Sequence, residues 1–362
     1  SVYLIKNSNS GMRWYAFLLY PFALIYDLVT RLRNWFFDIG WLKSAFSPIK
    51  SIVVGNLSVG GTGKTPMVEF LIRMLHKEQK LATLSRGYGR KTRGFLKASP
   101  EVSPEEIGDE PFQIYQKFGQ NISVFVGEDR LNALNEIATQ PNAPELILLD
   151  DSYQHRYVNG DLKILLSTFQ KPVFSDFLLP MGRLRESRSG AKRADLIIIT
   201  KCPNQLNDSE KIRFRNEASN YCKLNTPVLF SSISYGEPIP LGISLLFSPK
   251  VILLTGLAND QPLVDYVHEK FELLKVLRYP DHHDYAEVDF DKLAHAFRQL
   301  ASQNPVVLTT EKDAVKVKSN APEGFLAEIP IFVLPIEVRF SQEDEQTLAL
   351  QIQQKVLKKD KI

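Results

Sequence analysis

The sequence predicts an α/β protein of two domains, and three observations support this fold class. The chain has 362 residues, enough to form two hydrophobic cores. Short apolar runs alternate with segments that are apolar at helical spacing, as in parallel strands joined by helices. Turn-forming residues concentrate at 235–240, and a second series of strands and helices follows them. We therefore expect a first domain at 1–235, a smaller α/β domain at 236–340 with linker strands at its ends, and a C-terminal helix at 341–362.

The overall composition is that of a folded globular protein, with 44% hydrophobic and 23% charged residues. The net charge of +3 is too small to indicate a nucleic-acid partner, and we expect none. Cys202 and Cys222 have neither the spacing of a redox motif nor that of metal ligands. A reducing, cytoplasmic environment fits this cysteine usage best.

The first domain is organised around residues 51–66, which read Ser-Ile-Val-Val-Gly-Asn-Leu-Ser-Val-Gly-Gly-Thr-Gly-Lys-Thr-Pro and predict a strand, a glycine-rich loop and a helix. Such a loop binds phosphate because its N–H groups converge on the anion and the helix N-terminus adds positive charge. Lys64 would reach the β- and γ-phosphates, and the Thr65 hydroxyl would bind Mg²⁺. The expected nucleotide-binding residues of the loop are Gly60, Gly61, Thr62, Gly63, Lys64 and Thr65. Ser58 stands where the Walker A pattern has glycine, and a turn without a ligand is the alternative interpretation.

Two carboxylates follow the run at 145–149, whose continuous apolar character predicts a strand buried on both faces. Asp150 and Asp151 are therefore candidates for the Walker B position, in which an Asp holds Mg²⁺ directly or through water. Further strands of the first domain are expected at 81–84, 122–125, 162–166, 195–200 and 227–231. In the second domain we expect strands at 251–255, 273–277, 306–309 and 331–333, a linker strand at 336–340, and helices at 262–270 and 343–358.

Between these strands lie loops that carry charged side chains. Residues 85–90, Ser-Arg-Gly-Tyr-Gly-Arg, leave the end of a strand, where open α/β sheets place ligand loops. Residues 178–188 place Arg183, Arg185 and Arg188 around Glu186, which suits a polyanionic substrate. Solvated basic loops are the alternative interpretation of both segments. Residues 99–111 are expected to form a further loop, with a helix beginning near residue 112.

The N-terminal region is apolar and aromatic. Residues 14–26 are apolar nearly all round, but they are too few to span a bilayer, and a secretory signal is not expected. Arg31 and Arg33 precede an aromatic run at 35–37, which suits a helix lying on an anionic membrane surface. A helix packed on the domain core explains the same pattern equally well.

Taken together, the motifs resemble the tetraacyldisaccharide 4′-kinases of lipid A synthesis. The matching blocks are residues 55–66, 84–90, 108–111, 150–156, 184–186, 281–285 and 310–313. The resemblance covers roughly residues 13–339. It implies two α/β/α sandwich domains, the first P-loop NTPase-like, joined by a short two-stranded linker. It also implies transfer of the ATP γ-phosphate to the 4′-hydroxyl of a tetraacyldisaccharide 1-phosphate, giving lipid IVA, at the cytoplasmic face of the inner membrane of a Gram-negative bacterium.

The resemblance also implies roles for individual residues. The expected catalytic residues are Asp109, His282, Lys64 and Arg185, with Arg130 contacting ATP. The metal site would contain Thr65, Asp150, Asp151, Gln154 and Glu186. The sugar hydroxyl needs a base within hydrogen-bond reach, which we expect to be Asp109 working with His282, although His283 is adjacent. The chain departs from the family at Ser152 and Tyr153, where Gly-Phe is usual.

A second class of function uses the same loop. A P-loop switch or assembly ATPase would couple nucleotide hydrolysis to binding of a protein partner. The arginine-rich loop and the amphipathic N-terminus favour the lipid kinase, and a guanine-specificity motif of the Asn-Lys-x-Asp kind does not follow a later strand. The expected partners are therefore the lipid A disaccharide and an anionic membrane surface, with no obligate protein partner.

Overall fold

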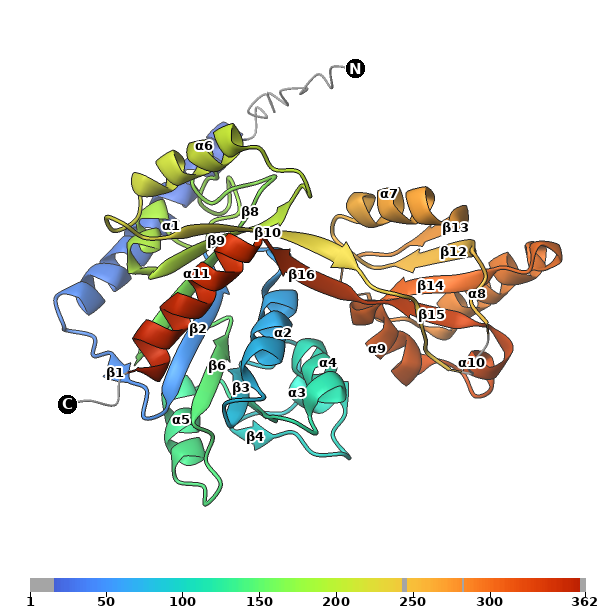
Figure 1. Ribbon diagram of the computed structural model, residues 1–362, viewed down its shortest axis with the longest axis horizontal. Coiled ribbons are helices and arrows are strands. Elements are labelled where there is room, and N and C mark those ends of the chain that lie inside the picture. Colours follow the sequence, from blue (N-terminus) through green and yellow to red (C-terminus); the bar gives the residue numbers. More distant parts are fainter. Residues whose placement is uncertain (1–15, 243–245, 282, 359–362) are drawn as a thin grey trace.

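The computed structural model describes residues 16–242, 246–281 and 283–358, and these form two large sheets that lie side by side (Figure 1) and a small two-stranded sheet. Each large sheet is mostly parallel and carries helices on both faces. The predicted α/β fold class is confirmed.

The first sheet has nine strands in the order β16-β10-β9-β8-β2-β6-β3-β5-β4. Its strands are β2 (Lys50–Asn56), β3 (Leu81–Ser85), β4 (Leu96–Lys97), β5 (Ser123–Val126), β6 (Leu146–Asp150), β8 (Leu162–Thr168), β9 (Leu196–Cys202), β10 (Val228–Tyr235) and β16 (Ile336–Phe340). Only the edge strands β4 and β16 pair antiparallel to their neighbours in this sheet as described. The strand that leads into the phosphate loop, β2, lies at the centre between β6 and β8.

Alternating side chains of β2 explain the layers of the first sheet. Ile52 and Val54 enter one core, whereas Val53 enters the core on the opposite face. The first face is covered by α2 (Lys64–Leu75), α4 (Asp109–Phe118) and α11 (Gln342–Ile352), and the other by α5 (Arg130–Ala138) and α6 (Asp208–Ser219). A strand buried on both faces must be apolar throughout, which is the pattern that the sequence shows.

The second sheet has five strands in the order β11-β15-β14-β12-β13. They are β11 (Ile239–Pro240), β12 (Lys250–Thr255), β13 (Glu272–Arg278), β14 (Val306–Thr310) and β15 (Ile331–Leu334). The helices α8 (Glu287–Gln299) and α9 (Glu311–Asn320) contribute to one core, and α7 (Gln261–Lys270) contributes to the other.

The strands β10 and β16 connect the two parts of the chain and pair antiparallel with each other (Figure 1). After β16 the chain returns to the first sheet, because Leu348, Ile352 and Val356 are buried in the same core as β2. The boundaries at 235/236 and 340/341 stay a prediction. Short elements complete the chain: β1 (Ala45–Phe46), β7 (Val158–Asn159), α3 (Pro104–Ile107), α10 (Phe325–Glu328), and the short helical turns Arg188–Arg193, Ala301–Gln303 and Gln353–Leu357.

One predicted boundary is wrong. The helix expected to begin near residue 112 is α4, and it begins at Asp109, so Asp109 lies in the first helical turn and not in a loop. The loop expected at 99–111 also contains the short helix α3. Gly108 separates the two helices with φ of 92°, a conformation that glycine adopts without strain. Pro111 is tolerated so close to the helix start because its missing N–H would have no intrahelical partner there.

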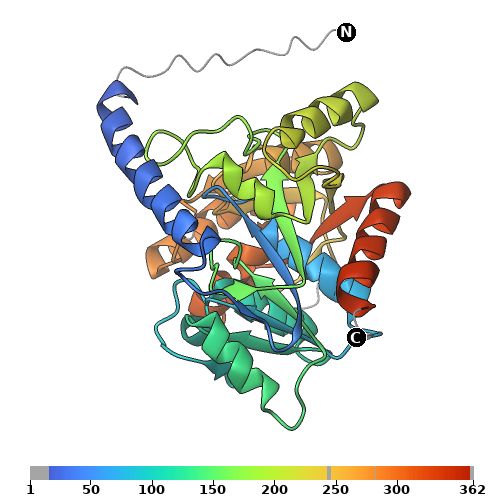
Figure 2. The ribbon, with the colours of Figure 1, turned by 90° about the vertical axis from the view of Figure 1, so that its left-hand side faces the viewer.

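The first helix, α1 (Ala16–Asp38), lies along one side of the first sheet (Figure 2). Its inner face is partly buried, with Ala23 and Phe37 in contact with the rest of the protein. The outer face exposes large apolar side chains: Tyr20, Phe22, Leu24, Ile25, Leu28, Val29, Leu32 and Trp35. In the part of the chain that the structure describes, α1 included, no helix is both long and apolar enough to cross a bilayer. The first two residues of the apolar stretch predicted at 14–26 lie outside the described residues.

Candidate active site

The phosphate loop joins β2 to α2 at the carboxyl edge of the first sheet. Gly60 and Gly63 have φ of 98° and 84°, so both need the left-handed conformation that favours glycine. Thr62 is buried between them, where its hydroxyl accepts a hydrogen bond from Asn56 Nδ2 at 2.7 Å. The Thr200 hydroxyl, at the end of β9, donates to the Thr62 carbonyl at 2.8 Å. The loop is therefore held in shape by neighbouring strands.

Two cations converge on one carboxylate beside this loop. Lys64 Nζ lies 3.5 Å from one oxygen of Asp151, and Arg185 Nη1 lies 3.3 Å from the other. Burial by itself would raise the pKa of Asp151, but Lys64 and Arg185 together hold it below its ordinary value. Asp151 is thus ionised at neutral pH, and it keeps both cations at the mouth of the phosphate loop.

Asp150, the last residue of β6, has a different environment. Its side chain is buried, and its Oδ1 has no hydrogen-bond partner among the described residues. Burial raises the pKa of Asp150 to about 7, Glu110 adds to the shift, and Lys64 opposes it. A buried carboxylate oxygen without a donor fits a bound cation, and Thr65 brings a hydroxyl oxygen at the start of α2. The described residues contain no cluster of three or more His, Cys, Asp or Glu side chains for a metal.

Arg130, at the start of α5, lies close enough to the acidic pair to feel both charges. It is buried, and its Nη1 donates to the carbonyls of Gly127 and Glu128, both at 2.9 Å. Burial lowers the pKa of Arg130 to about 10, the charge of Arg86 adds to the effect, and Asp151 and Asp150 oppose it. Its Nε has no partner among the described residues, so this arginine keeps a donor for a ligand.

The arginine-rich loop is fixed against the phosphate loop by backbone pairing. Val59 donates to the Arg183 carbonyl at 2.8 Å, and Arg185 donates to the Leu57 carbonyl at 2.7 Å. This pairing explains why Arg185 reaches Asp151. The Arg183 side chain turns away and binds Asp176 at 2.9 Å.

Glu186 and Gln154 border the site through other partners. The Glu186 carboxylate is buried and accepts from Arg193 at 2.6 Å and from Asn34 of α1 at 2.9 Å. Gln154 donates from Nε2 to the Asn56 carbonyl, at the end of β2. The structure therefore places both side chains next to the site, each engaged with an element that frames it.

The backbone between Asp151 and Gln154 accommodates the departure from the family pattern. Asp151 has φ of 46°, so the left-handed turn falls on Asp151. Tyr153 is buried, and its hydroxyl donates to the Gly190 carbonyl at 2.9 Å. A Cβ on Gly55 would lie only 2.7 Å from the Tyr153 Cβ, so the tyrosine packs directly on the central strand.

Asp109 faces the second sheet. Its Oδ2 lies 3.4 Å from Lys316 Nζ of α9. His283 is held by Asp289 at 2.8 Å and packs between the rings of Tyr279 and Tyr285. His282, the predicted partner of Asp109, lies outside the described residues.

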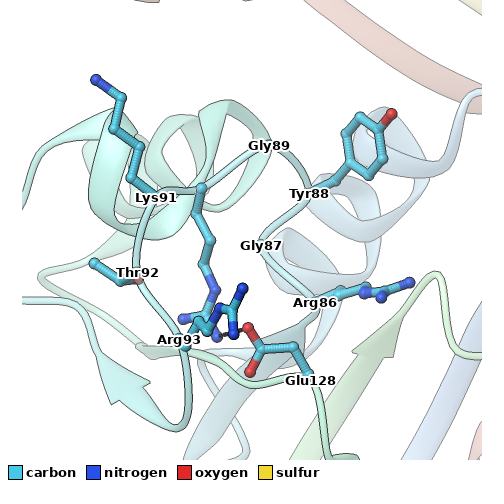
Figure 3. Close-up of a pocket in the computed structure, with 9 residues that line it drawn as sticks. Arg86, Gly87, Tyr88, Gly89, Lys91, Thr92, Arg93 and Glu128 are labelled. Carbon is cyan, nitrogen blue, oxygen red and sulfur yellow. Dashed lines mark hydrogen bonds and ion pairs between the residues drawn. The ribbon is translucent and has the colours of Figure 1, made fainter.

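A cavity of about 660 Å³ lies beside α4 and is lined mainly by residues 86–93 and Glu128 (Figure 3). Arg90 donates to Glu128 at 2.6 Å, but its Nε and Nη1 are buried and have no hydrogen-bond partner among the described residues. A Cβ on Gly108 would lie 2.9 Å from the Tyr88 carbonyl oxygen, so this loop packs closely on the start of α4. Four basic residues and one acidic residue line the cavity, so it is cationic and suits an anion.

Some residues of the site were not predicted from the sequence. Lys201 has φ of 57° at the end of β9, and its Nζ lies 3.8 Å from the position of a Cβ on Gly61. Asn56 organises both Thr62 and Gln154. Both residues could have been predicted from their position near the carboxyl ends of parallel strands, where α/β sheets bind ligands.

This geometry defines a protein of the P-loop NTPase class, with a phosphate loop, a lysine and an acidic pair at the carboxyl edge of a parallel sheet. The family model described as "Tetraacyldisaccharide-1-P 4'-kinase" matches residues 15–356. The chain therefore belongs to the tetraacyldisaccharide-1-P 4′-kinase family, and the predicted family is confirmed.

Individual proteins give the same result. The chain is 40% identical over 333 residues to a tetraacyldisaccharide 4′-kinase of Flavobacterium psychrophilum, covering 91% of this chain and 93% of that one. It is 38% identical over 340 residues to the enzyme of the same name from Phocaeicola vulgatus, covering 91% and 92%. A crystal structure of LpxK from Aquifex aeolicus in complex with ATP aligns with a TM-score of 0.73 at 28% identity, covering 94% of this chain and 99% of that one.

Proposed function

We propose that this protein transfers the γ-phosphoryl group of ATP to the 4′-hydroxyl of a tetraacyldisaccharide 1-phosphate, with Mg²⁺ as its metal cofactor. The observation that carries the proposal is the convergence of Lys64 and Arg185 on Asp151 beside the phosphate loop, in a chain that matches the kinase family over residues 15–356. The same match argues against the alternative of a P-loop switch or assembly ATPase.

The phosphate loop is the proposed ATP site. Its backbone N–H groups and the N-terminus of α2, with roughly half a unit of positive charge, attract the phosphates. Lys64 and Arg185 are proposed to leave Asp151 in part and to stabilise charge on the γ-phosphate during transfer. Arg130 is proposed to use its remaining donor on ATP. The LpxK relative crystallised with ATP supports the choice of nucleotide.

Thr65 and Asp150 are the proposed metal ligands, with Asp151, Gln154 and Glu186 around them. The buried Asp150 oxygen without a donor is the strongest support for this assignment. Mg²⁺ would supply positive charge to the β- and γ-phosphate oxygens. Gln154 and Glu186 shape the site from outside, through the contacts that they make with Asn56 and α1.

Asp109 is the proposed base, working with His282. The acceptor oxygen forms a bond to the γ-phosphorus while the bond from that phosphorus to the β–γ bridging oxygen breaks, and ADP leaves. The hydroxyl proton passes to Asp109. Because the carboxylate comes from α4 and the imidazole from the other part of the chain, the pair would depend on how the two sheets are placed.

The acceptor lipid is proposed to enter between α1 and the cavity of residues 86–93. The exposed apolar face of α1 suits contact with acyl chains and with a membrane surface, while its inner face contacts the site: Tyr26 donates to the Arg185 carbonyl at 2.8 Å. The cationic cavity suits an anionic group of the lipid. We therefore propose peripheral attachment to the cytoplasmic face of the inner membrane, without an obligate protein partner or nucleic acid.

The test is ATP turnover by the full chain, measured with and without the disaccharide 1-phosphate in mixed detergent micelles. The proposal expects turnover that depends on the lipid, with phosphate recovered on the disaccharide. Turnover that is indifferent to the lipid would overturn it and favour the switch ATPase.

A further inference from the structure

The helices α4 and α9 form a contact between the two sheets, and ion pairs mark both of its ends (Figure 1). Asp109, in the first turn of α4, pairs with Lys316 in the middle of α9. Lys117, in the last turn of α4, pairs with Glu311 in the first turn of α9. The two helices therefore run in opposite directions, and both ends of α4 meet side chains of opposite charge on α9.

Lys117 also binds a carboxylate deep in the first sheet's helical layer. Glu69 lies on α2, the helix that begins at the phosphate loop, and is 1% exposed. Its Oε2 accepts from Lys117 at 2.7 Å and from Arg73 at 3.2 Å, and its Oε1 accepts from Gln113 at 2.8 Å. Burial raises the pKa of Glu69, and Lys117 opposes that shift. The ammonium group of Lys117 is thus shared between a buried anion of α2 and an anion of the second sheet.

Glu311 lies in the first turn of α9, whose next residues bind Asp281 and Tyr285. The next residue, Lys312, pairs with Asp281. Asp313 accepts from the Tyr285 hydroxyl at 3.1 Å and from the Gly256 N–H at 3.0 Å. Asp281 and Tyr285 are therefore both bound to side chains in the first turn of α9.

Glu311 reaches the connecting strands as well. Its second oxygen accepts from the Ile336 N–H at 3.2 Å, at the first residue of β16. Glu311 therefore contacts both Lys117 of α4 and the first residue of β16.

We infer that Lys117 is a positioning residue: by bridging Glu69 and Glu311, it couples the phosphate-loop helix α2 to the first turn of α9, which binds Asp281 and Tyr285. The inference rests on the proposed function, since it concerns the placement of Asp109 and His282 for phosphoryl transfer. Lys117 does not touch the reacting groups. Lys117 sets the relative placement of the elements that carry the reacting groups. Its loss lowers the fraction of molecules in which the base and the phosphate loop are correctly placed for the reaction.

Two variants separate this role from simple stabilisation of the first sheet. Lys117→Met removes both ion pairs and leaves Glu69 with Arg73 and Gln113. Glu311→Gln removes only the charge of the link between the sheets, because glutamine still accepts from Ile336 and the Glu69–Lys117 pair is untouched. Lys211→Met is the matched control, since the ion pair of Lys211 lies within one turn of α6, with Asp208 at 3.9 Å.

The experiment measures kcat and KM for ATP with the lipid acceptor, together with thermal melting of each variant. We expect Lys117→Met and Glu311→Gln each to lower kcat about tenfold, with KM for ATP changed by less than about twofold. The double variant should be no worse than about tenfold, since both changes break one link. Lys117→Arg should recover most of the loss, and Lys211→Met should match the wild type.

The outcomes distinguish the inference from the proposed function. A wild-type protein that fails to phosphorylate the lipid overturns both. With an active wild type, a Glu311→Gln enzyme of normal kcat overturns the inference, as does a double variant whose losses multiply. If Lys117→Met melts too low to assay, Glu311→Gln alone decides.

Discussion

Lys64→Ala should abolish most phosphoryl transfer while leaving the protein folded. Lys64 is the first residue of α2, its side chain is 13% exposed, and its Nζ lies 3.5 Å from Asp151. A preorganised donor or cation at a site of developing charge contributes about 10²–10³ in kcat, or about 2.7–4 kcal/mol. We therefore expect a loss of about a thousandfold in kcat, with weaker ATP binding as a second effect.

The cost to stability should be small, because Asp151 keeps its second cation. Arg185 remains 3.3 Å away, and the Asp151 side chain is one-third exposed (34%), so screening limits the loss to about 1 kcal/mol or less. That corresponds to a Tm shift of roughly 2–4 °C at most.

The pH dependence follows from the lowered pKa of Asp151. A carboxylate with a depressed folded pKa stabilises the protein above its unfolded pKa, and this contribution is lost as the pH falls through the folded value. The Tm of the Lys64→Ala variant should therefore differ most from that of the wild type near neutral pH. The two Tm values should become equal in acid, below the pKa range of carboxylates.

The assay pairs lipid-dependent ATP turnover with calorimetric ATP titration and thermal melts at neutral and acid pH. Lys250→Ala is the control, since Lys250 pairs with Glu272 at 4.0 Å across β12 and β13 of the second sheet. Near-normal turnover in Lys64→Ala would refute the assignment of the phosphate loop. A collapse in Tm far beyond the expected shift would show that Lys64 acts on the fold and not on the nucleotide.

Three further sets of substitutions test the acidic pair, the N-terminal helix and the catalytic base. Asp150→Asn should lose activity yet melt at a higher temperature than the wild type at pH 8 without ligands. The reason is that the pKa of Asp150 is raised to about 7 in the folded protein, so the ionisation of Asp150 lowers the stability of the wild type as the pH rises from about 4 to 7. An equal or lower Tm of the variant would contradict this. Replacing Ile25 and Leu28 with Ser should weaken sedimentation with anionic vesicles, since each exposed apolar side chain contributes on the order of 1.5–3 kcal/mol when it leaves water; unchanged sedimentation would place the membrane contact elsewhere. Asp109→Ala and His282→Ala should each lower kcat much more than they raise KM for ATP, and the double variant should be little worse than the weaker single one; additive losses would separate the two residues.

The sequence by itself determined those elements whose structure depends only on neighbouring residues. The phosphate loop was predictable because left-handed turns require glycine, and Gly60 and Gly63 occupy such turns. The strand β6 was predictable because burial on both faces demands an unbroken apolar run, and the polar Asp150 ends it. The motif order also sufficed to identify the family, which the match over residues 15–356 confirms.

The N-terminal helix shows where local sequence leaves two solutions open. Its pattern predicted either membrane contact or packing on the core. The structure combines a packed inner face with an exposed apolar outer face, since Phe37 is buried whereas Phe22 is 63% exposed. The start of α4 at Asp109 was missed because Pro111 reads as a loop residue, although the first helical turn tolerates it.

Tertiary structure alone decided which charged side chains meet. Arg183 and Arg185 are equivalent in the sequence pattern, yet one binds Asp176 and the other reaches Asp151, because the loop pairs with residues 57–59. Lys117 is not part of any recognisable motif. Its proposed positioning role depends on Glu69 and Glu311, which lie far from it along the chain. Ion pairs of this kind are set by the packing of α2, α4 and α9, and a long side chain's partner depends on that packing and not on its neighbours in sequence.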